Sequence, residues 1–182
     1  MAKTRIAVIV GSLRKESFNR QLADALPGLA PDVEFTQLRI DDLPPYNQDD
    51  DAAQPAPAKR LKAEIAAATG LIFVTPEYNR SMPGLLKNAI DHASRPYGQS
   101  AFKGKPAGVL GVSVGAAGTA MAQQHLRNVL AYLDVPTLGQ PEVFIQAKEG
   151  VFAGPGKLGD SAQQFVQGWM KTYLEFVRRH AG

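Results

Sequence analysis

Apolar residues along this chain fall into two repeating patterns that predict different elements. Short runs rich in β-branched residues are typical of strands buried on both faces of a sheet, whereas alternation of apolar and polar residues indicates a more exposed strand. Residues 6–10 are of the first kind and residues 33–40 of the second. The segments that predict strands are residues 6–10, 33–40, 71–74, 107–112 and 142–145.

Between these runs, apolar residues recur every three or four positions, which is the spacing of one helix face. The segments with this spacing are residues 17–28, 59–69, 83–94, 119–133 and 159–180. Pro27-Gly28 should end the first of them, and Gly70 should close the second. Residues 41–58 are rich in proline and aspartate and predict a long surface loop. The last helix should bury the stripe Phe165, Val166, Trp169, Tyr173, Phe176 and Val177.

The alternation of strands and helices indicates an α/β fold. Strands joined by helical crossovers run parallel, and right-handed crossovers place helices on both faces of the sheet. Five strands suit a flavodoxin-like doubly wound parallel sheet with the order 2-1-3-4-5, and we expect residues 1–182 to form a single domain. Ligands of such sheets lie beyond the carboxyl ends of the strands, at the switch point between strands one and three.

Composition narrows the function classes. The 182 residues carry a net charge of +3 with both signs interspersed, which argues against a nucleic-acid-binding surface. The chain has no cysteine, which excludes disulfides, thiol catalysis and cysteine-ligated metals. Residues 1–5 lead directly into the first strand without a signal peptide, and no apolar run has the length needed to cross a bilayer. We therefore expect a cytoplasmic protein that does not bind membranes.

The loop after the first strand carries groups suited to an anion. Residues 11–19 read Gly-Ser-Leu-Arg-Lys-Glu-Ser-Phe-Asn. The helix that follows offers unpaired N–H groups and the positive end of its dipole, and the side chains of Ser12, Arg14, Ser17 and Asn19 add donors that suit a phosphate. The alternative is that Ser17 only caps the helix and Arg14 is solvated. The loop has neither a Walker A ending nor a Gly-x-Gly-x-x-Gly motif.

The loop after the third strand carries a different set of groups. It begins Thr-Pro-Glu-Tyr-Asn at residues 75–79 and reaches a second proline at position 83. Glu77, Tyr78 and Asn79 supply a carboxylate, a phenol and a carboxamide, a mixture that suits a planar heterocycle with carbonyl and N–H groups. The alternative is an ordinary polar loop. Its expected position beside the first loop favours a shared ligand site.

The loop after the fourth strand permits two interpretations. Residues 111–118 read Gly-Val-Ser-Val-Gly-Ala-Ala-Gly, so the backbone can approach a ligand closely. The same residues match the Gly-x-Ser-x-Gly motif of serine hydrolases, with Ser113 as nucleophile. An acid and then a histidine would have to follow, and Asp134 or Asp160 with His180 has that order. His180 lies close to the end of a helix, where a solvated role is more common.

Two further patterns carry no site. Residues 154–159 match Gly-x-Gly-x-x-Gly, but too little chain follows to complete a βαβ unit, so they predict a turn before the last helix. His92 lies within a predicted helix, where a partly exposed structural role is expected. The histidine and carboxylate residues nowhere have the spacing of metal ligands, so we predict no metal.

Several motifs together resemble the NADPH-dependent FMN reductase family, which includes bacterial chromate and quinone reductases and related azoreductases. The resemblance covers residues 6–145. The matching segments are Gly-Ser-Leu-Arg-x-x-Ser-x-Asn at 11–19, Leu-Pro-Pro-Tyr-Asn at 43–47, Thr-Pro-Glu-Tyr-Asn at 75–79, Pro-Gly-Leu-Leu-Lys-Asn-Ala-Ile-Asp at 83–91 and Ser-Arg-Pro at 94–96.

The resemblance implies positions for the cofactor FMN. The first loop would hold its phosphate and the second would run along its isoalloxazine ring, with Ser113 and Gly115 in a third ring-side loop. The implied cofactor-binding residues are Ser12, Arg14, Ser17, Phe18, Asn19, Pro76, Glu77, Tyr78, Asn79, Ser113 and Gly115. Family members form homodimers or homotetramers, which implies contacts through residues 83–94 and 119–133. The chain departs from many relatives at His92 and at Ala116-Ala117.

The implied activity is that of an NAD(P)H-dependent oxidoreductase. In a ping-pong reaction, NADPH or NADH would deliver hydride to FMN, and a quinone, chromate, an azo- or nitro-aromatic compound or free flavin would then take the electrons. The cofactor carries this chemistry, so we name no catalytic residue. A flavodoxin-like electron carrier and a serine esterase using Ser113 are the alternatives.

Overall fold

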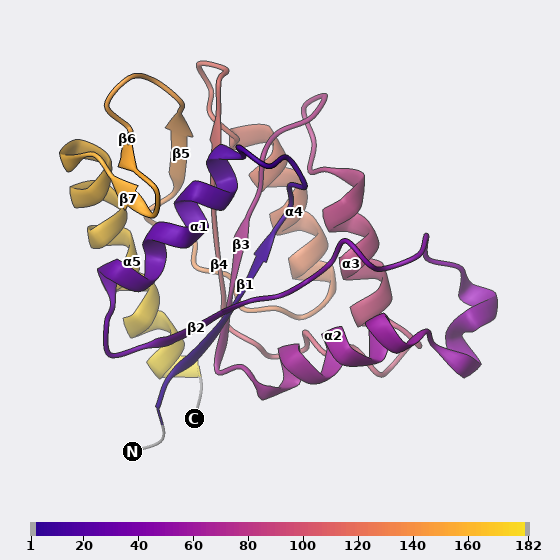
Figure 1. Ribbon diagram of the computed structural model, residues 1–182. Coiled ribbons are helices and arrows are strands. Elements are labelled where there is room, and N and C mark those ends of the chain that lie inside the picture. Colours follow the sequence, from indigo (N-terminus) through magenta and orange to yellow (C-terminus); the bar gives the residue numbers. More distant parts are fainter. Residues whose placement is uncertain (1–2, 181–182) are drawn as a thin grey trace.

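The computed structural model describes residues 3–180 and contains a five-stranded parallel sheet with the order β2-β1-β3-β4-β5 (Figure 1). Its strands are β1 (Arg5–Val10), β2 (Glu34–Gln37), β3 (Gly70–Val74), β4 (Ala107–Ser113) and β5 (Val143–Gln146). Val10 pairs with Val74, and Val74 pairs with Leu110. The three central strands therefore end at one edge of the sheet, which confirms the predicted flavodoxin-like α/β fold and places the loops that follow them together.

Helices cover both faces of the sheet. α1 (Phe18–Leu29) and α5 (Asp160–His180) lie on one face, at the left of Figure 1, and α2 (Ala56–Ala67), α3 (Gly84–Ser94) and α4 (Ala120–Tyr132) lie on the other. Successive strand residues point to opposite faces. In β1, Ile6, Val8 and Val10 accordingly pack with α1 and α5, whereas Ala7 and Ile9 pack with α2 and α3. The sheet thus separates two apolar cores.

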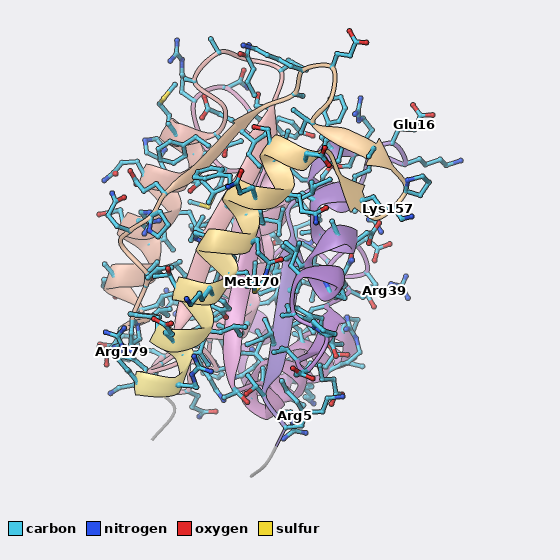
Figure 2. All side chains as sticks on the ribbon, turned by 90° about the vertical axis from the view of Figure 1, so that its left-hand side faces the viewer. Arg5, Glu16, Arg39, Lys157, Met170 and Arg179 are labelled. Carbon is cyan, nitrogen blue, oxygen red and sulfur yellow. The ribbon has the colours of Figure 1, made fainter. Side chains whose placement is uncertain are left out.

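Helix α5 contacts the sheet through two stacked aromatic rings. The rings of Trp169 and Tyr173 lie 5.1 Å apart and almost parallel, and both side chains are buried. A Cβ atom at Gly108 of β4 would lie only 2.6 Å from Cζ2 of Trp169, so only glycine lets the ring approach this closely. Figure 2 looks onto this helix and labels Met170, which is buried although the stripe prediction left it out. Phe165, which the stripe included, is 45% exposed.

Several predicted boundaries are wrong. Helix α1 continues past Pro27 to Leu29, because a proline in the last turn costs one hydrogen bond while Leu29 stays buried. Residues 41–58 are not entirely loop, since a 3₁₀ helix spans Gln48–Ala53 and α2 already begins at Ala56. Proline is tolerated in a first helical turn, where its missing N–H has no partner to lose. Gly70 starts β3, and strand β2 is shorter than the alternating pattern predicts.

A small hairpin between β5 and α5 was missed altogether. Strands β6 (Phe152–Gly154) and β7 (Lys157–Leu158) pair antiparallel, and the turn predicted at residues 154–159 lies partly within this hairpin. The hairpin lies beside α1 in both views, at the end of the molecule where Figure 2 labels Glu16 and Lys157. Within residues 3–180, no helix is both long and apolar enough to cross a membrane.

Candidate functional site

The loops after β1, β3 and β4 enclose a cleft of about 210 Å³ at the carboxyl edge of the sheet. The cleft lies where the strand order reverses, which is the expected place for a ligand in this fold. Its lining residues are Ser12, Arg14, Ser17, Phe18, Asn19, Pro76, Glu77, Tyr78, Val112, Ser113 and Val114. The predicted candidates therefore come together with the exception of Asn79 and Gly115. Val112 and Val114 are additional lining residues that the analysis of polar groups missed.

The first loop presents the amino end of α1 to the cleft. Ser17 is the N-cap, and its hydroxyl accepts a hydrogen bond of 3.3 Å from the backbone N–H of Arg20. Phe18 and Asn19 occupy the first helical turn, where backbone N–H groups have no partner inside the helix. Ser12 lines the same cleft and is only 4% exposed. The loop thus combines backbone donors, two hydroxyls and the helix dipole, as an anion site requires.

Arg14 adds a positive charge to this loop. Its guanidinium donates a hydrogen bond to the backbone carbonyl of Glu16, and its central carbon lies 5.0 Å from the centre of the Phe18 ring. A cation over an aromatic face is attracted by the negative charge density of the ring. Phe18 therefore supports the Arg14 side chain beside the cleft.

Asn19 has a structural role that the sequence did not reveal. Its amide nitrogen donates to the carbonyl oxygen of Val112 at 2.8 Å, and its amide oxygen accepts from the N–H of Val112 at 2.9 Å. This pair of buried hydrogen bonds connects α1 to β4. The side chain predicted to bind phosphate thus fixes the first loop against the third. These two hydrogen bonds do not use the backbone N–H of Asn19.

Glu77 also has a structural role. Its carboxylate accepts hydrogen bonds from the N–H groups of Met121 at 3.0 Å and Ala122 at 3.1 Å, which lie in the first turn of α4. A negative group at this position satisfies unpaired donors and interacts favourably with the helix dipole. Glu77 therefore caps a helix that lies far along the chain, and it holds the second loop beside the third.

The second loop continues as a tight turn. Tyr78 and Ser81 exchange both backbone hydrogen bonds, at 2.9 and 3.0 Å. Asn79 and Arg80 between them have φ angles of 51° and 65°. Positive φ at both central residues identifies a type I′ turn, which asparagine adopts readily and arginine does not. The turn directs Asn79 away from the cleft lining and leaves Tyr78 beside it.

The third loop leaves the end of β4 close to the second. A Cβ atom at Gly111 would lie 2.2 Å from the carbonyl oxygen of Thr75, so the first residue of the Gly-x-Ser-x-Gly match is needed for close approach of two backbones. The hydroxyl of Ser113 accepts a hydrogen bond from the N–H of Gly115 at 3.3 Å. Ala116 and Ala117 are exposed and absent from the cleft lining.

The histidines do not complete a serine nucleophile. The chain has three, and each has a hydrogen-bond partner other than Ser113. His125 contacts the Ser81 hydroxyl, and His180 contacts the carbonyl of Phe176. Among residues 3–180, no group of three or more metal-binding side chains is placed to hold a metal ion.

His92 lies away from the cleft and is more buried than predicted. It is 2% exposed, its Nε2 lies 2.8 Å from the carbonyl oxygen of Pro44, and its ring meets that of Tyr46 edge to face. Burial raises the pKa of Tyr46, and the neighbouring Asp51 carboxylate raises it further. These contacts fasten the 41–58 segment to α3.

Two exposed apolar side chains line the cleft. Tyr78 and Val114 belong to the second and third loops, and they are 52% and 72% exposed. Large apolar groups gathered at a cleft mark a surface that a ligand or another protein covers. Leu13 of the first loop is 57% exposed but does not line this cleft. An apolar residue in the loop after β4 is the signal by which Val114 could have been found.

Known proteins with similar sequences and structures are FMN and quinone reductases. A family model described as NADPH-dependent FMN reductase matches residues 4–150. A 2-hydroxy-1,4-benzoquinone reductase from Burkholderia is 52% identical over 176 residues, which are 96% of each chain. A quinone reductase from Pseudomonas putida is 47% identical, covering 95% of this chain and 94% of that protein. The solved structure of FerB, a flavoenzyme NAD(P)H:(acceptor) oxidoreductase from Paracoccus denitrificans, has a TM-score of 0.93 at 43% identity, covering 97% of this chain and 98% of FerB.

Proposed function

Since the chain belongs to the NADPH-dependent FMN reductase family, we propose that its cleft binds FMN, with the phosphate at the amino end of α1 and the ring beside the other two loops. FMN is the cofactor and NAD(P)H the co-substrate of the family, and quinone reduction is the activity in the names of the similar enzymes. One observation carries the placement: three loops far apart in sequence meet at the switch point and line a single cleft.

The residues of the first loop fit a phosphate. The hydroxyls of Ser12 and Ser17, the guanidinium of Arg14 and the backbone N–H groups of Phe18 and Asn19 are the groups that would hold it. They supply neutral donors, a full positive charge and the positive end of a helix dipole, which together match a dianion. In this assignment, the Asn19 side chain positions the loop, and the backbone N–H of Asn19 binds the phosphate.

The second and third loops fit a flat heterocycle. Pro76, Tyr78 and Val114 offer apolar surface, while backbone groups of the two loops and the Ser113 hydroxyl offer hydrogen bonds. Glu77 serves by fixing the second loop to α4, as its two hydrogen bonds require. Asn79 and Gly115, implied by the resemblance as ring-side residues, would act through the turn and the loop that they form.

FMN held by the three loops would supply the redox chemistry, which is hydride transfer from NAD(P)H and electron transfer to an acceptor in a ping-pong order. The chain itself orients the reactants and keeps one side of the cleft apolar, and no side chain acts as acid or base. Quinones are the first acceptors we propose; chromate, azo- and nitro-aromatic compounds and free flavin are further ones. The exposed Tyr78 and Val114 suit the flat faces of such acceptors.

We also propose that the protein acts as a homodimer or homotetramer. Pockets that enclose a cofactor-sized ligand have volumes of about 300–1,000 Å³, and the cleft of one chain has about 210 Å³. A second copy covering the cleft, with α3 and α4 as contact helices, would complete the enclosure. Residues 1–182 would form one domain acting in the cytoplasm; residues 1–2 and 181–182 lie outside the described part of the chain.

The deciding experiment uses the purified wild-type protein. It should bind FMN, and NADPH or NADH should bleach the visible flavin absorption, which a quinone then restores. Retention of FMN without bleaching by either nucleotide would point to an electron carrier instead. A protein that binds no FMN would overturn the proposal. Labelling of Ser113 by a fluorophosphonate would favour the esterase.

A further inference from the structure

The β6–β7 hairpin contacts the proposed phosphate site from outside the cleft. The family model ends at residue 150, and the hairpin starts at Phe152. The rings of Phe152 and Phe18 are stacked, with centres 6.0 Å apart and planes 8° from parallel. Figure 1 shows the hairpin next to α1. The stacked rings therefore bring a segment far along the chain against Phe18, the first residue of that helix.

Three side chains form a stack that leads from the hairpin to the cleft. Phe152 lies against Phe18, and the guanidinium of Arg14 lies 5.0 Å from the centre of the same Phe18 ring. Phe18 and Arg14 line the cleft, whereas Phe152 does not. Phe152 can therefore affect a ligand in the cleft only through the residues in front of it.

The stack has a physical use because Arg14 is exposed. A free arginine side chain has many rotamers, and holding one of them for a ligand has an entropic cost. An aromatic surface next to the guanidinium attracts it and would restrict those rotamers before the ligand arrives. Phe18 can offer that surface only if its own ring is fixed.

The hairpin is firmly attached, so it can fix that ring. Leu158 of β7 is buried and belongs to the core shared by α1 and α5. The N–H of Gly159 donates to the carbonyl oxygen of Val151 at 2.9 Å, which closes the base of the hairpin. Phe152 pairs with the buried Leu158 across the hairpin, and this pairing fixes the position of Phe152.

We propose that Phe152 is a positioning residue for the cofactor phosphate, acting through the Phe18 ring on the Arg14 guanidinium. This inference rests on the proposed function, because it takes FMN as the ligand. It assigns a role in cofactor affinity to a residue outside the cleft and outside the matched family region. The role should be specific to the phosphate, because the stack ends at the Arg14 guanidinium, which has the charge that a phosphate requires.

The test compares FMN with riboflavin, which has the same ring system and no phosphate. Phe152→Ala should raise the dissociation constant for FMN roughly two- to fivefold, the scale of a cation–π contact at an exposed site. The constant for riboflavin should not change. Phe152→Tyr keeps the aromatic ring and should bind FMN as the wild type does. Phe165→Ala removes a half-exposed ring from α5 and serves as the control.

A double substitution tests the route of the effect. In the Arg14→Ala background, Phe152→Ala should have no further effect on FMN affinity, because the group that it positions is gone. All constants are measured by calorimetry on apoprotein, and thermal unfolding confirms that each variant is folded.

Three outcomes would overturn the inference. They are an unchanged FMN constant in Phe152→Ala, an equal weakening of FMN and riboflavin, and independent effects of the two substitutions in the double variant. Each of these presumes that the wild type binds FMN, so they differ from failure of the proposed function, in which the wild type binds none. That last result would overturn both.

Discussion

Among the described residues that line the cleft, Arg14 carries the one positive charge, and it belongs to the same loop as the hydroxyls of Ser12 and Ser17. A guanidinium keeps its charge at every pH of interest and forms charge-assisted hydrogen bonds with phosphate. Such bonds contribute more than neutral ones, and their loss is measurable one residue at a time. At the scale of single residues, we therefore expect affinity for the cofactor to depend most on Arg14.

Arg14→Ala should weaken FMN binding by about 1.5–3 kcal/mol, the range of a hydrogen bond to a charged group. Lys15→Ala removes the same charge from the same loop without removing a residue that lines the cleft, so its effect should be much smaller. Titration of apoprotein with FMN measures both. Equal affinity in the wild type and Arg14→Ala would show that Arg14 does not hold the phosphate.

Asn19→Ala should lower the free energy of unfolding by about 2–3 kcal/mol. The substitution removes two hydrogen bonds and leaves the buried N–H and C=O of Val112 without their partner. Asn128→Ala on the exposed face of α4 is the control and should stay within about 0.5 kcal/mol of the wild type. Urea unfolding followed by circular dichroism gives both values. Comparable small losses in both variants would contradict the structural role of Asn19.

Side-chain roles are the part of the site that sequence predicts least well. The hydroxyls and the charge of the first loop were predicted from a helix start, which is a local pattern, and they line the cleft. The roles of Asn19 and Glu77 depend on partners 93 and 44–45 residues away. A polar side chain in a loop looks the same in sequence whether it faces a ligand or a distant backbone.

Helix α4 begins at a point where a side chain from another loop satisfies its first N–H groups. Thr119 is the N-cap, and no cap hydrogen bond from its side chain occurs in the described structure. The Glu77 carboxylate supplies those bonds instead. The Glu77 carboxylate therefore links the second loop to the start of α4. A substitution at Glu77 should affect the stability of this helix.

Glu77→Ala should destabilise the protein by about 0.5–2 kcal/mol, as the loss of a helix cap does. Glu77→Gln keeps an acceptor oxygen and loses only the charge next to the helix dipole, so about 0.3–1 kcal/mol is expected. Thermal unfolding of the two variants beside the wild type checks the order. A larger loss for glutamine than for alanine would be inconsistent with capping.

Arg80→Gly should stabilise the protein by about 0.5–1 kcal/mol. Arg80 has a φ of 65°, a conformation that costs an L-residue about 1–2 kcal/mol and glycine almost nothing, while glycine loses more entropy on folding. Arg80→Ala removes the same side chain and keeps the strained φ, so it should not stabilise. Denaturant midpoints distinguish the two. Equal midpoints for glycine and alanine would show that the backbone strain is negligible.

Elements were predicted well where a pattern has one physical cause. Continuous apolar runs predicted β1 and β3 to within one residue, because short runs of this kind are typical of strands buried on both faces of a sheet. Predictions failed where local rules have exceptions, as at Pro27 in the last turn of α1 and Pro57 in the first turn of α2. The β6–β7 hairpin is too short to leave an alternating pattern, and its pairing depends on a core formed by other segments.

Tyr173 connects the largest helix to the sheet. Its hydroxyl donates a hydrogen bond of 2.8 Å to the carbonyl oxygen of Leu71, and complete burial raises its pKa well above the ordinary value of 10.0. In the unfolded chain the same group would ionise near pH 10. Above that pH the unfolded chain holds fewer protons than the folded one, so stability falls as pH rises.

The whole protein should therefore lose about 1.4 kcal/mol of stability per pH unit above pH 10 through this group. Tyr173→Phe has no such proton. It should be less stable than the wild type near pH 7, by about 0.5–1.5 kcal/mol for the lost hydrogen bond, and the difference should shrink or reverse above pH 10. Burial lowers the pKa of Lys105, which acts in the opposite direction, but it is common to both proteins. Urea unfolding between pH 7 and pH 11 tests this, and a constant difference would refute it.

The order of the strands follows from rules that hold for whole molecules. Right-handed crossovers and the switch point require the loops that follow β1 and β3 to meet, whatever their residues are. This is why the place of the cleft could be predicted although the roles of Asn19 and Glu77 could not. The proposed assembly of several copies would depend on exposed side chains such as Leu13 and Val114, which have no periodic pattern.

Trp169 is the only tryptophan in the chain. Its ring projects from α5 against Gly108 of the sheet and stacks on Tyr173. The tryptophan fluorescence of the protein therefore comes from one indole at one defined interface. Release of α5 from the sheet would expose that indole to water and shift its emission to longer wavelength, with no added label. The same ring that forces a glycine into the middle of β4 thus makes the docking of the last helix directly observable in solution.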